Sequence, residues 1–208
     1  MDNIDAIIYI NLKHRTDRNE HILKEIQKIC TDQSKIHRID AIYIIDNGAL
    51  GCSMSHIKAF EYILQHPEWN NCLIVEDDFT FISQNINENN NIISLFFNDF
   101  PDFDCCNLEF NHNRVNYENT LTDNVKRVFY SLSSSAYIVS KDFLPKILEN
   151  FKEAVNDRIN NGNSHNNCLD VHWSKLMKIS NWYIINPALG YQYNNYSDIE
   201  KQITHYGC

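Results

Sequence analysis

Glycine and proline are scarce in this chain, and long uncharged apolar runs are absent from its sequence. The 208 residues include only 5 Gly and 4 Pro, whereas 43% are hydrophobic and 12% are aromatic. This composition excludes collagen-like and low-complexity chains and is typical of a folded globular protein. No apolar run approaches the roughly 20 residues that a membrane-spanning helix needs. The length predicts one domain over residues 1–208 with a substantial core.

Positive charge is also in short supply. The chain has 18 Lys and Arg against 27 Asp and Glu, which gives a formal net charge of −9. We therefore expect no nucleic-acid partner, because phosphate backbones are held mainly by Lys and Arg. An acidic protein that binds an anionic substrate usually needs a cation between the two, so a metal ion is a natural expectation.

The cysteines and the N-terminus indicate a reducing compartment. The 7 cysteines are odd in number and include no CxxC pair, so we expect reduced thiols in a cytosol-like environment. The first five residues lack the basic region of a signal peptide, which predicts a cytoplasmic protein. The abundance of Asn and Ile, both encoded by A/T-rich codons, indicates an A/T-rich genome. If the chain is viral, its expected location is the host cytoplasm.

Short apolar runs alternate with amphipathic stretches along the chain. Strands are predicted at residues 6–10, 35–45, 72–75, 106–110, 136–139 and 182–185, and helices at 16–30, 53–64, 92–100, 143–151 and 169–179. Thr16 or Asp17 would cap the first helix, and Ser53 or Ser55 would start the second. Residues 111–123 are predicted to be a loop and residues 190–208 an irregular tail. The alternation predicts an α/β protein with one open sheet.

The sharpest motif is the acidic triplet Glu76-Asp77-Asp78, which follows the predicted strand at 72–75. Three carboxylates at the end of a buried strand repel one another and are poorly solvated, so a divalent cation would stabilise them. Side chains alternate along an extended chain, which predicts that Glu76 and Asp78 point the same way and grip one metal. Such a metal can hold a diphosphate and stabilise its departure. The alternative is a solvated acidic turn.

Further stretches occur in a characteristic order with this triplet. They are Tyr9–Leu12 with Arg15 and Arg18, Arg38–Ala41, Gly51-Cys52, Ser55-His56, Leu73–Asp78, Ser135–Ser140, Leu169–Val171, Pro187, Gln192 and Ser197–Ile199. The ordered set spans almost the whole chain and resembles glycosyltransferase family 25, the family of bacterial lipooligosaccharide transferases and animal collagen-modifying transferases. The resemblance implies a GT-A-type, Rossmann-like open sheet with flanking helices. It also implies a UDP-sugar donor and usually Mn²⁺, and hence a UDP-sugar-dependent hexosyltransferase.

The resemblance assigns donor-binding residues near the N-terminus. Ile10, Asn11 and Leu12 would line the uridine pocket, and Arg15 or Arg18 would meet ribose or phosphate. Arg suits phosphate because its planar fork donates two parallel hydrogen bonds. Basic side chains at a helix start also oppose the helix dipole, which favours a binding role over simple solvation.

Four further donor-site candidates come from other segments. Ser55 and His56 would lie near the start of a helix whose free N–H groups bind anions. A His56 satisfied by a backbone carbonyl is the alternative. Asp40 is expected at a strand end close to the donor, and Asp77 would complete the donor site beside the metal.

The resemblance also supplies a catalytic residue and a third metal ligand. Asp170 is the candidate base that removes the acceptor proton in an inverting reaction. In a retaining reaction it would orient the acceptor or support the leaving group, and a plain helix cap is the structural alternative. His205 would join Glu76 and Asp78 as a metal ligand. His172 is the rival, although a packing or sugar-binding role suits it better.

The acceptor is the least determined part of this interpretation. Within the family we favour transfer of galactose or glucose to collagen hydroxylysine or galactosyl-hydroxylysine, with lipooligosaccharide or another surface glycan as the alternative. A non-catalytic nucleotide-sugar or glycan-binding module is the alternative from another class. A nucleotidyltransferase is disfavoured because no Gly-rich phosphate loop occurs near the start. The sequence leaves the oligomeric state open, a homodimer included.

Overall fold

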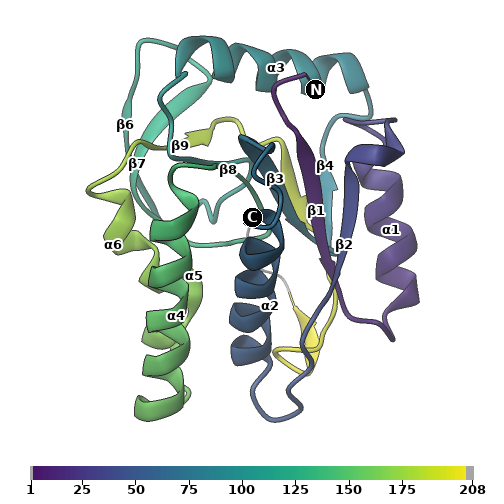
Figure 1. Cartoon of the computed structure of the whole chain (residues 1–208), viewed down its shortest axis with the longest axis vertical. Helices are drawn as coiled ribbons and strands as arrows, with labels where there is room; N and C mark the ends of the chain where they lie inside the picture. The colour runs from purple at the N-terminus through teal and green to yellow at the C-terminus, as the bar shows by residue number, and fades with distance from the viewer. Residues whose placement is uncertain (1, 205–208) are drawn as a thin grey trace.

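A mixed eight-stranded sheet organises the chain in the computed structural model, which describes residues 2–204 (Figure 1). The strand order is β2-β1-β3-β8-β5-β9-β7-β6. Parallel pairs join β1 (Ala6–Asn11) to β2 (Ile36–Asp40) and to β3 (Asn71–Glu76), and β5 (Cys105–Asn107) to β9 (Trp182–Ile185). The antiparallel strands are β6 (Val115–Asn119), β7 (Val125–Ser131) and β8 (Ala136–Ser140). The carboxyl ends of β1, β2 and β3 therefore lie at one edge of the sheet.

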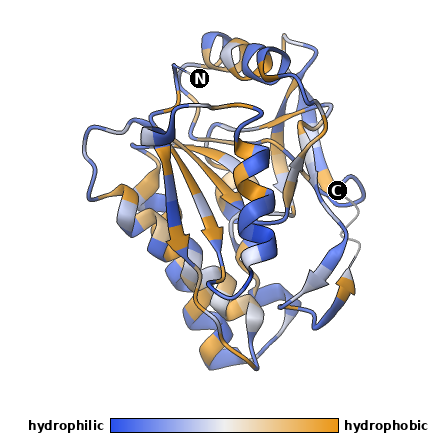
Figure 2. Ribbon diagram, turned by 90° about the vertical axis from the view of Figure 1, so that its right-hand side faces the viewer, coloured by the Kyte–Doolittle hydropathy of each residue, from blue (hydrophilic) through white to orange (hydrophobic). Residues whose placement is uncertain are grey.

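Helices cover both faces of this sheet (Figure 1). On one face lie α1 (Thr16–Ile26) and α3 (Ile86–Asp99), and on the other lie α2 (Gly48–Ile63), α4 (Leu144–Asn161), α5 (Leu169–His172) and α6 (Ser174–Met177). Short 3₁₀ turns, η1 (Gln33–Lys35) and η2 (His165–Asn167), precede β2 and α5. Figure 2 shows apolar and polar residues alternating around the helices, as expected for helices that cover a sheet. The predicted α/β open sheet with flanking helices is confirmed.

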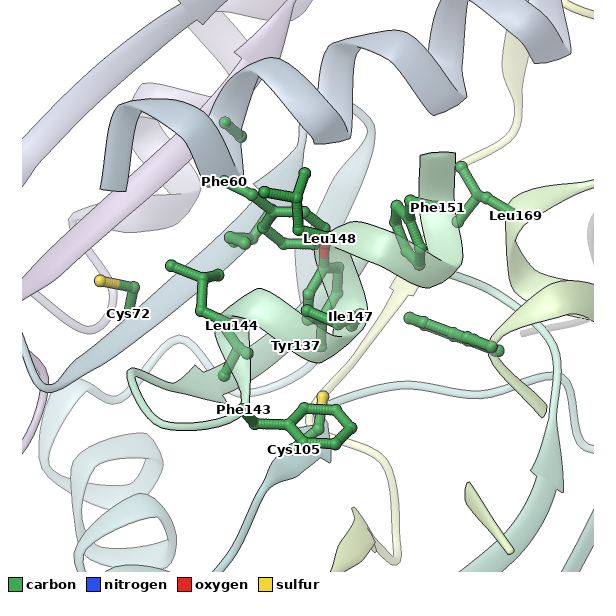
Figure 3. Close-up of a cluster of buried hydrophobic side chains, with 14 of the residues drawn as sticks. Phe60, Cys72, Cys105, Tyr137, Phe143, Leu144, Ile147, Leu148, Phe151 and Leu169 are labelled. Carbon is green, nitrogen blue, oxygen red and sulfur yellow. The ribbon is translucent and has the colours of Figure 1, made fainter. Parts of the chain in front are cut away.

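The core has two halves, one on each side of the sheet. Along β1, Ile8 and Ile10 pack toward α2 and α4, whereas Ile7 packs toward α1 and α3, and all three are almost fully buried. This explains the continuous apolar run of β1, because a strand covered on both faces needs no polar side. Figure 3 shows the first half, in which Phe60 of α2 contacts Phe151 of α4 at a ring distance of 5.1 Å.

The C-terminal segment forms two small hairpin-like sheets instead of an irregular tail. Strand β10 (Gly190–Gln192) pairs with β4 (Phe79–Phe81), and β11 (Asn195–Ser197) pairs with β12 (Gln202–Thr204). A Cβ at Gly190 would lie 2.3 Å from the Phe79 ring, so this pairing requires glycine there. The β4–β10 pair holds the C-terminal segment beside the acidic triplet.

One predicted helix start and one predicted helix cap are wrong. Helix α2 begins at Gly48, not at Ser53 or Ser55, because the Asn47 side chain accepts a hydrogen bond from Leu50 N at 3.2 Å and caps the helix. Helix α1 begins after Arg15 without a side-chain cap, so Thr16 and Asp17 do not cap it. The sequence Asp46-Asn47-Gly48, which is typical of a turn, thus also contains the residue that caps α2.

Three other segments differ from their predicted form. Residues 111–123 contain β6, an edge strand whose side chains are mostly exposed and so carry no apolar signal. The second strand ends at Asp40 instead of reaching residue 45, and the predicted helix at 169–179 is divided into α5 and α6. None of the helices within residues 2–204 is both long and apolar enough to cross a bilayer.

Asn47 joins the start of α2 to α4, and its loss should cost more stability than the loss of an ordinary cap. Its Oδ1 also accepts from the buried Arg158 Nε at 2.7 Å. We expect Asn47→Ala to lower the free energy of unfolding by about 2–3 kcal/mol in urea denaturation, because it removes the cap and leaves Arg158 Nε without its acceptor, while Nη1 keeps its bond to Ser164 O. The matched control is Asn85→Ala, which removes only the exposed cap of α3, at a cost of about 1 kcal/mol. Equal losses would contradict the role of Arg158.

Candidate active site

A cavity of about 380 Å³ lies at the carboxyl edge of β1 and β3. Its wall combines the end of β1, the loop after β2, one face of α2, the acidic triplet, residues 132–134 after β7, the start of α5 and the C-terminal residues 192 and 197–200. Open α/β sheets bind ligands at this edge, and the volume is within the range of small-molecule pockets. Segments from the whole chain thus meet at one site.

The acidic triplet lies in the wall of this cavity. Glu76 is the last residue of β3, and Asp77 and Asp78 form the turn before β4. Arg18 Nη1 from α1 donates to Asp77 Oδ1 at 2.9 Å and to Asp78 Oδ2 at 3.1 Å. Asn11 Nδ2 donates to the other Asp77 oxygen at 2.7 Å. Asp77 and Asp78 therefore share a cation from within the protein, and the alternative of a freely solvated acidic turn is wrong.

Strict side-chain alternation does not extend through the triplet, because the chain turns after Glu76. Glu76 and Asp78 were expected to point the same way and bind one metal together. In the structure the three carboxylates of the triplet have two different sets of partners. Asp77 and Asp78 converge on Arg18, while Glu76 Oε1 accepts from Ser134 Oγ at 2.8 Å and lies 3.2 Å from His56 Nε2. All three carboxylates nevertheless line the same cavity.

Burial makes these carboxylates electrostatically unequal. Burial raises the pKa of Asp78 to about 7, with Arg18 opposing the shift and the charges of Glu76 and Asp77 adding to it. Burial also raises the pKa of Asp77, again against Arg18. Burial works in the same direction on Glu76, but the hydrogen bond and charge of His56 outweigh it and lower the pKa of Glu76. The acidic side chains in the cavity lining outnumber its two arginines, Arg18 and Arg114, so the lining carries an excess of acidic groups.

The excess charge fits a divalent cation. The cavity lining contains two arginines and six carboxylates, those of Glu76, Asp77, Asp78, Asp170, Asp198 and Glu200. Arg18 pairs with Asp77 and Asp78, and carboxylate oxygen is the ligand type that suits Mn²⁺ and Mg²⁺. Glu76, Asp77 and Asp78 are the residues that would hold such an ion. His205, the expected third ligand, lies outside the described residues.

Asp170 lines the same cavity from the first turn of α5. Its Oδ2 accepts from Ser133 N at 3.2 Å, and Cys168, not Asp170, occupies the N-cap position of this helix. Burial raises the pKa of Asp170. Ser133 has φ of 84°, a left-handed conformation that costs on the order of 1–3 kcal/mol and is concentrated at functional sites. Asp170 is therefore held by a strained backbone rather than by a routine cap.

The predicted N-terminal donor site is only partly assembled at the cavity. Ile10, Leu12 and Arg18 line it, and Asn11 reaches it through its hydrogen bond to Asp77. Arg15 is outside the lining and pairs with Asp17 at 2.8 Å and with Asp198 at 2.6 Å.

Asp40 is an exposed residue at the end of β2 that contacts Arg38 at 3.3 Å and is also outside the lining. The structure therefore does not place Asp40 or Arg15 in the cavity wall.

Ser55 and His56 occupy the middle of α2, so the expected anion site at a helix start is wrong for them. Ser55 Oγ donates to Gly51 O at 2.6 Å and accepts from Ile42 N at 2.8 Å. A Cβ at Gly51 would lie 2.4 Å from Ile42 O, so this approach of loop and helix requires glycine. His56 is fully buried, and its partners are the Tyr137 hydroxyl and Glu76 instead of the backbone carbonyl considered as an alternative.

Several residues at the site were not predicted from the sequence. Ser134 holds Glu76, and Gln192 Nε2 donates to Asp78 Oδ1 at 3.3 Å. Cys52 lies one helical turn before His56 in the cavity wall. Gln192 and Cys52 lie in stretches that carry the family resemblance, and this was the sequence signal by which they could have been found. His172 is outside the cavity lining, and its Nε2 lies 3.2 Å from Asp157.

Solved structures share this fold. A glycosyltransferase involved in the glycosylation of the major capsid of PBCV-1 has a TM-score of 0.58 and 12% identity over 94% of this chain and 95% of its own. UDP-glucose pyrophosphorylase complexed with UDP-glucose has a TM-score of 0.54 and 9% identity over 88% of this chain and 90% of its own. At these identities the likeness is one of fold.

Sequence comparison identifies the family. The curated proteins include no significant match to this sequence. The profile of glycosyltransferase family 25, described as LPS biosynthesis protein, matches residues 44–161, which is more than half of the 208 residues and includes α2, the acidic triplet and all of α4. The chain therefore belongs to glycosyltransferase family 25.

Proposed function

We propose that this glycosyltransferase moves a hexose, galactose or glucose, from a UDP-sugar to a hydroxyl acceptor with the help of a divalent cation such as Mn²⁺. The observation that supports this most strongly is the cavity at the ends of β1 and β3, where Arg18, the acidic triplet and Asp170 share one wall. Family membership supports sugar transfer, and the geometry supports an anionic donor held beside concentrated negative charge.

The donor is proposed to lie between β1 and the acidic triplet. Ile10 and Leu12 offer an apolar surface to the uracil ring, and Arg18 offers a guanidinium to the diphosphate. A bound cation would neutralise the diphosphate and stabilise the departing UDP. Glu76, Asp77 and Asp78 would hold that cation, and Asn11 and Gln192 would keep the aspartates in place through their hydrogen bonds.

Asp170 is proposed as the group that receives the acceptor proton. A bond forms between the acceptor oxygen and C1 of the hexose while the bond from C1 to the diphosphate oxygen breaks, and the electron pair leaves with UDP. The acceptor proton passes to the Asp170 carboxylate. Burial raises the pKa of Asp170, which makes the carboxylate a better base, and the Ser133 N–H fixes its orientation.

The acceptor proposed first is the hydroxyl of collagen-type hydroxylysine or galactosyl-hydroxylysine, and a lipooligosaccharide hydroxyl is the second class. Support for these comes from the family alone. A screen of UDP-sugars for released UDP, first without acceptor and then with each acceptor class, tests the proposal. Release from no UDP-sugar under any metal condition would reject it, and UDP binding without release would favour a binding module.

Asp78→Ala should abolish metal-dependent turnover. Removing this carboxylate takes one oxygen ligand from the proposed metal site, so UDP release should fall by about 100-fold or more. The measurement is UDP release with Mn²⁺, alongside circular dichroism to verify the fold. The matched control is Asp142→Ala, at an exposed site outside the cavity lining, which should leave the rate unchanged. Full activity of Asp78→Ala in EDTA would refute the metal assignment.

Asp170→Asn should impair the chemical step more than donor binding. The amide keeps the size of the side chain and cannot accept the proton, so kcat should fall by roughly 10²–10⁴. The Kd for UDP with Mn²⁺, measured by calorimetry, should change by less than about threefold because the residue is proposed to contact the acceptor side. An unchanged kcat would remove Asp170 from the mechanism.

Without added metal, Asp78 should make stability fall as pH rises from about 4 to about 7. Its pKa is raised to about 7 from 3.8, so in this window the folded state binds more protons than the unfolded state and loses stability as they dissociate. Asp78→Asn has no titrating carboxyl group at this position, so this contribution to the pH dependence is absent. Urea denaturation should show wild type losing on the order of 1 kcal/mol or more relative to Asp78→Asn across that range. Adding Mn²⁺ at about pH 7 should restore the stability of the wild type. Parallel pH profiles would contradict this.

A further inference from the structure

A cysteine, a histidine and a glutamate meet in the cavity wall, and the proposed sugar transfer leaves the thiol unused. The Cys52 sulfur, a His56 ring nitrogen and a Glu76 carboxylate oxygen all lie within 4.8 Å of one another. Cys52 and His56 are one turn apart on α2, so they share a helix face. Glu76 reaches them from the end of β3.

This donor set differs in chemistry from the carboxylates beside it. Sulfur, imidazole nitrogen and carboxylate oxygen are the ligands of Zn²⁺, and three protein ligands with one open position are typical of accessible zinc sites. Tetrahedral zinc with such bonds places its ligand atoms roughly 3.3–3.8 Å apart. The three atoms need to close by about 1.5 Å at most, and the half-buried Cys52 and Glu76 side chains would rotate to make this change. The open position would face the cavity that both residues line.

The surroundings hold the histidine in the orientation that such a site needs. The Tyr137 hydroxyl lies 2.8 Å from His56 Nδ1, and both side chains are fully buried. Nε2 is then the nitrogen that faces Glu76, at 3.2 Å. In a metal-bound state Nδ1–H would donate to Tyr137, and Ser134 Oγ already donates to Glu76 at 2.8 Å. Hydrogen bonds of this kind, made by groups that do not contact the metal, hold the ligands of metal sites in position.

The local charge favours a cation at this position. Burial raises the pKa of the Cys52 thiol well above its usual value, and the charges of Glu76, Asp170 and Asp78 add to the shift. These negative charges attract a cation, and cysteine binds a metal as the thiolate, so the thiol loses its proton when the metal binds.

We propose that Cys52, His56 and Glu76 form a binding site for a thiophilic divalent cation of the zinc type, separate from the Asp77 and Asp78 carboxylates. Glu76 belongs to both groups. Zinc bound here withdraws Glu76 from the acidic triplet and, if the function proposed above is correct, inhibits Mn²⁺-dependent transfer.

The test uses Co²⁺ as a spectroscopic probe on the full chain, reduced and freed of metal, without sugar nucleotide. One equivalent of Co²⁺ should give a near-ultraviolet thiolate-to-cobalt charge-transfer band, and Zn²⁺ should displace it. Cys52→Ser should remove the band and weaken Zn²⁺ binding, measured by chelator competition, by about tenfold or more. No band in the wild type, or an unchanged band in Cys52→Ser, overturns the proposal.

Two matched variants separate this site from its neighbours. Cys168→Ser removes the other thiol in the cavity wall and should keep the band, whereas loss of the band in this variant overturns the proposal. Asp78→Asn should also keep the band, because Asp78 belongs only to the carboxylate group. Loss of the band there would show that the thiolate-bound cobalt also requires Asp78, which overturns the proposed ligand set.

A second measurement needs no variant and covers the case in which Cys52→Ser misfolds. At a pH at which iodoacetamide alkylates both Cys52 and Cys168 of the metal-free wild type, Zn²⁺ should protect Cys52 while Cys168 continues to react, as read by peptide mass spectrometry. Equal protection of both thiols, or of neither, overturns the proposal. Because these readouts use no UDP-sugar, they are independent of whether the transferase proposal holds.

Discussion

Negative charge buried at the end of β3 is the constraint on which the site depends. Asp77 and Asp78 are almost fully buried, and a carboxylate in that setting is stable only with charged or hydrogen-bonding partners. Arg18 supplies the cation from α1, Asn11 supplies an amide from β1, and Gln192 supplies one from the C-terminal segment. Satisfying these two carboxylates therefore brings three distant parts of the chain together around one cavity.

The same requirement explains why the C-terminal segment lies where it does. Its strands are three residues each and pair outside the main sheet, so they contribute little burial of their own. Arg15 binds Asp198 at 2.6 Å, Arg18 donates to Tyr196 O at 3.0 Å, and Tyr193 N donates to Asp78 O at 3.0 Å. The segment thus closes the cavity by bonds to groups already fixed by β1, α1 and β3. Few apolar contacts and several polar ones are typical of wall segments that can open.

The parts of the molecule that could be predicted are those that depend on the pattern of apolar and polar residues along a short stretch of sequence. Strands β1 and β3 could be predicted because both faces of the sheet are covered, and the acidic triplet could be placed at a strand end for the same reason. The partners of Arg15 and His56 could not, because Asp198 and Glu76 are distant in sequence and come near only through the sheet order. Edge strand β6 was missed because exposed side chains carry no periodic signal.

The fold leaves the chemistry open, and the site restricts it. A glycosyltransferase and a UDP-glucose pyrophosphorylase both share this architecture, so the fold alone does not determine the reaction. Sugar transfer to a hydroxyl needs a base on the acceptor side in addition to groups that hold the diphosphate. Asp170 is in the cavity wall, arises from a different element than the triplet, and is held by the strained Ser133 backbone. Asp170 thus lies apart from the acidic triplet and has a pKa raised by burial, and this arrangement supports the proposal of transfer over nucleotide binding alone.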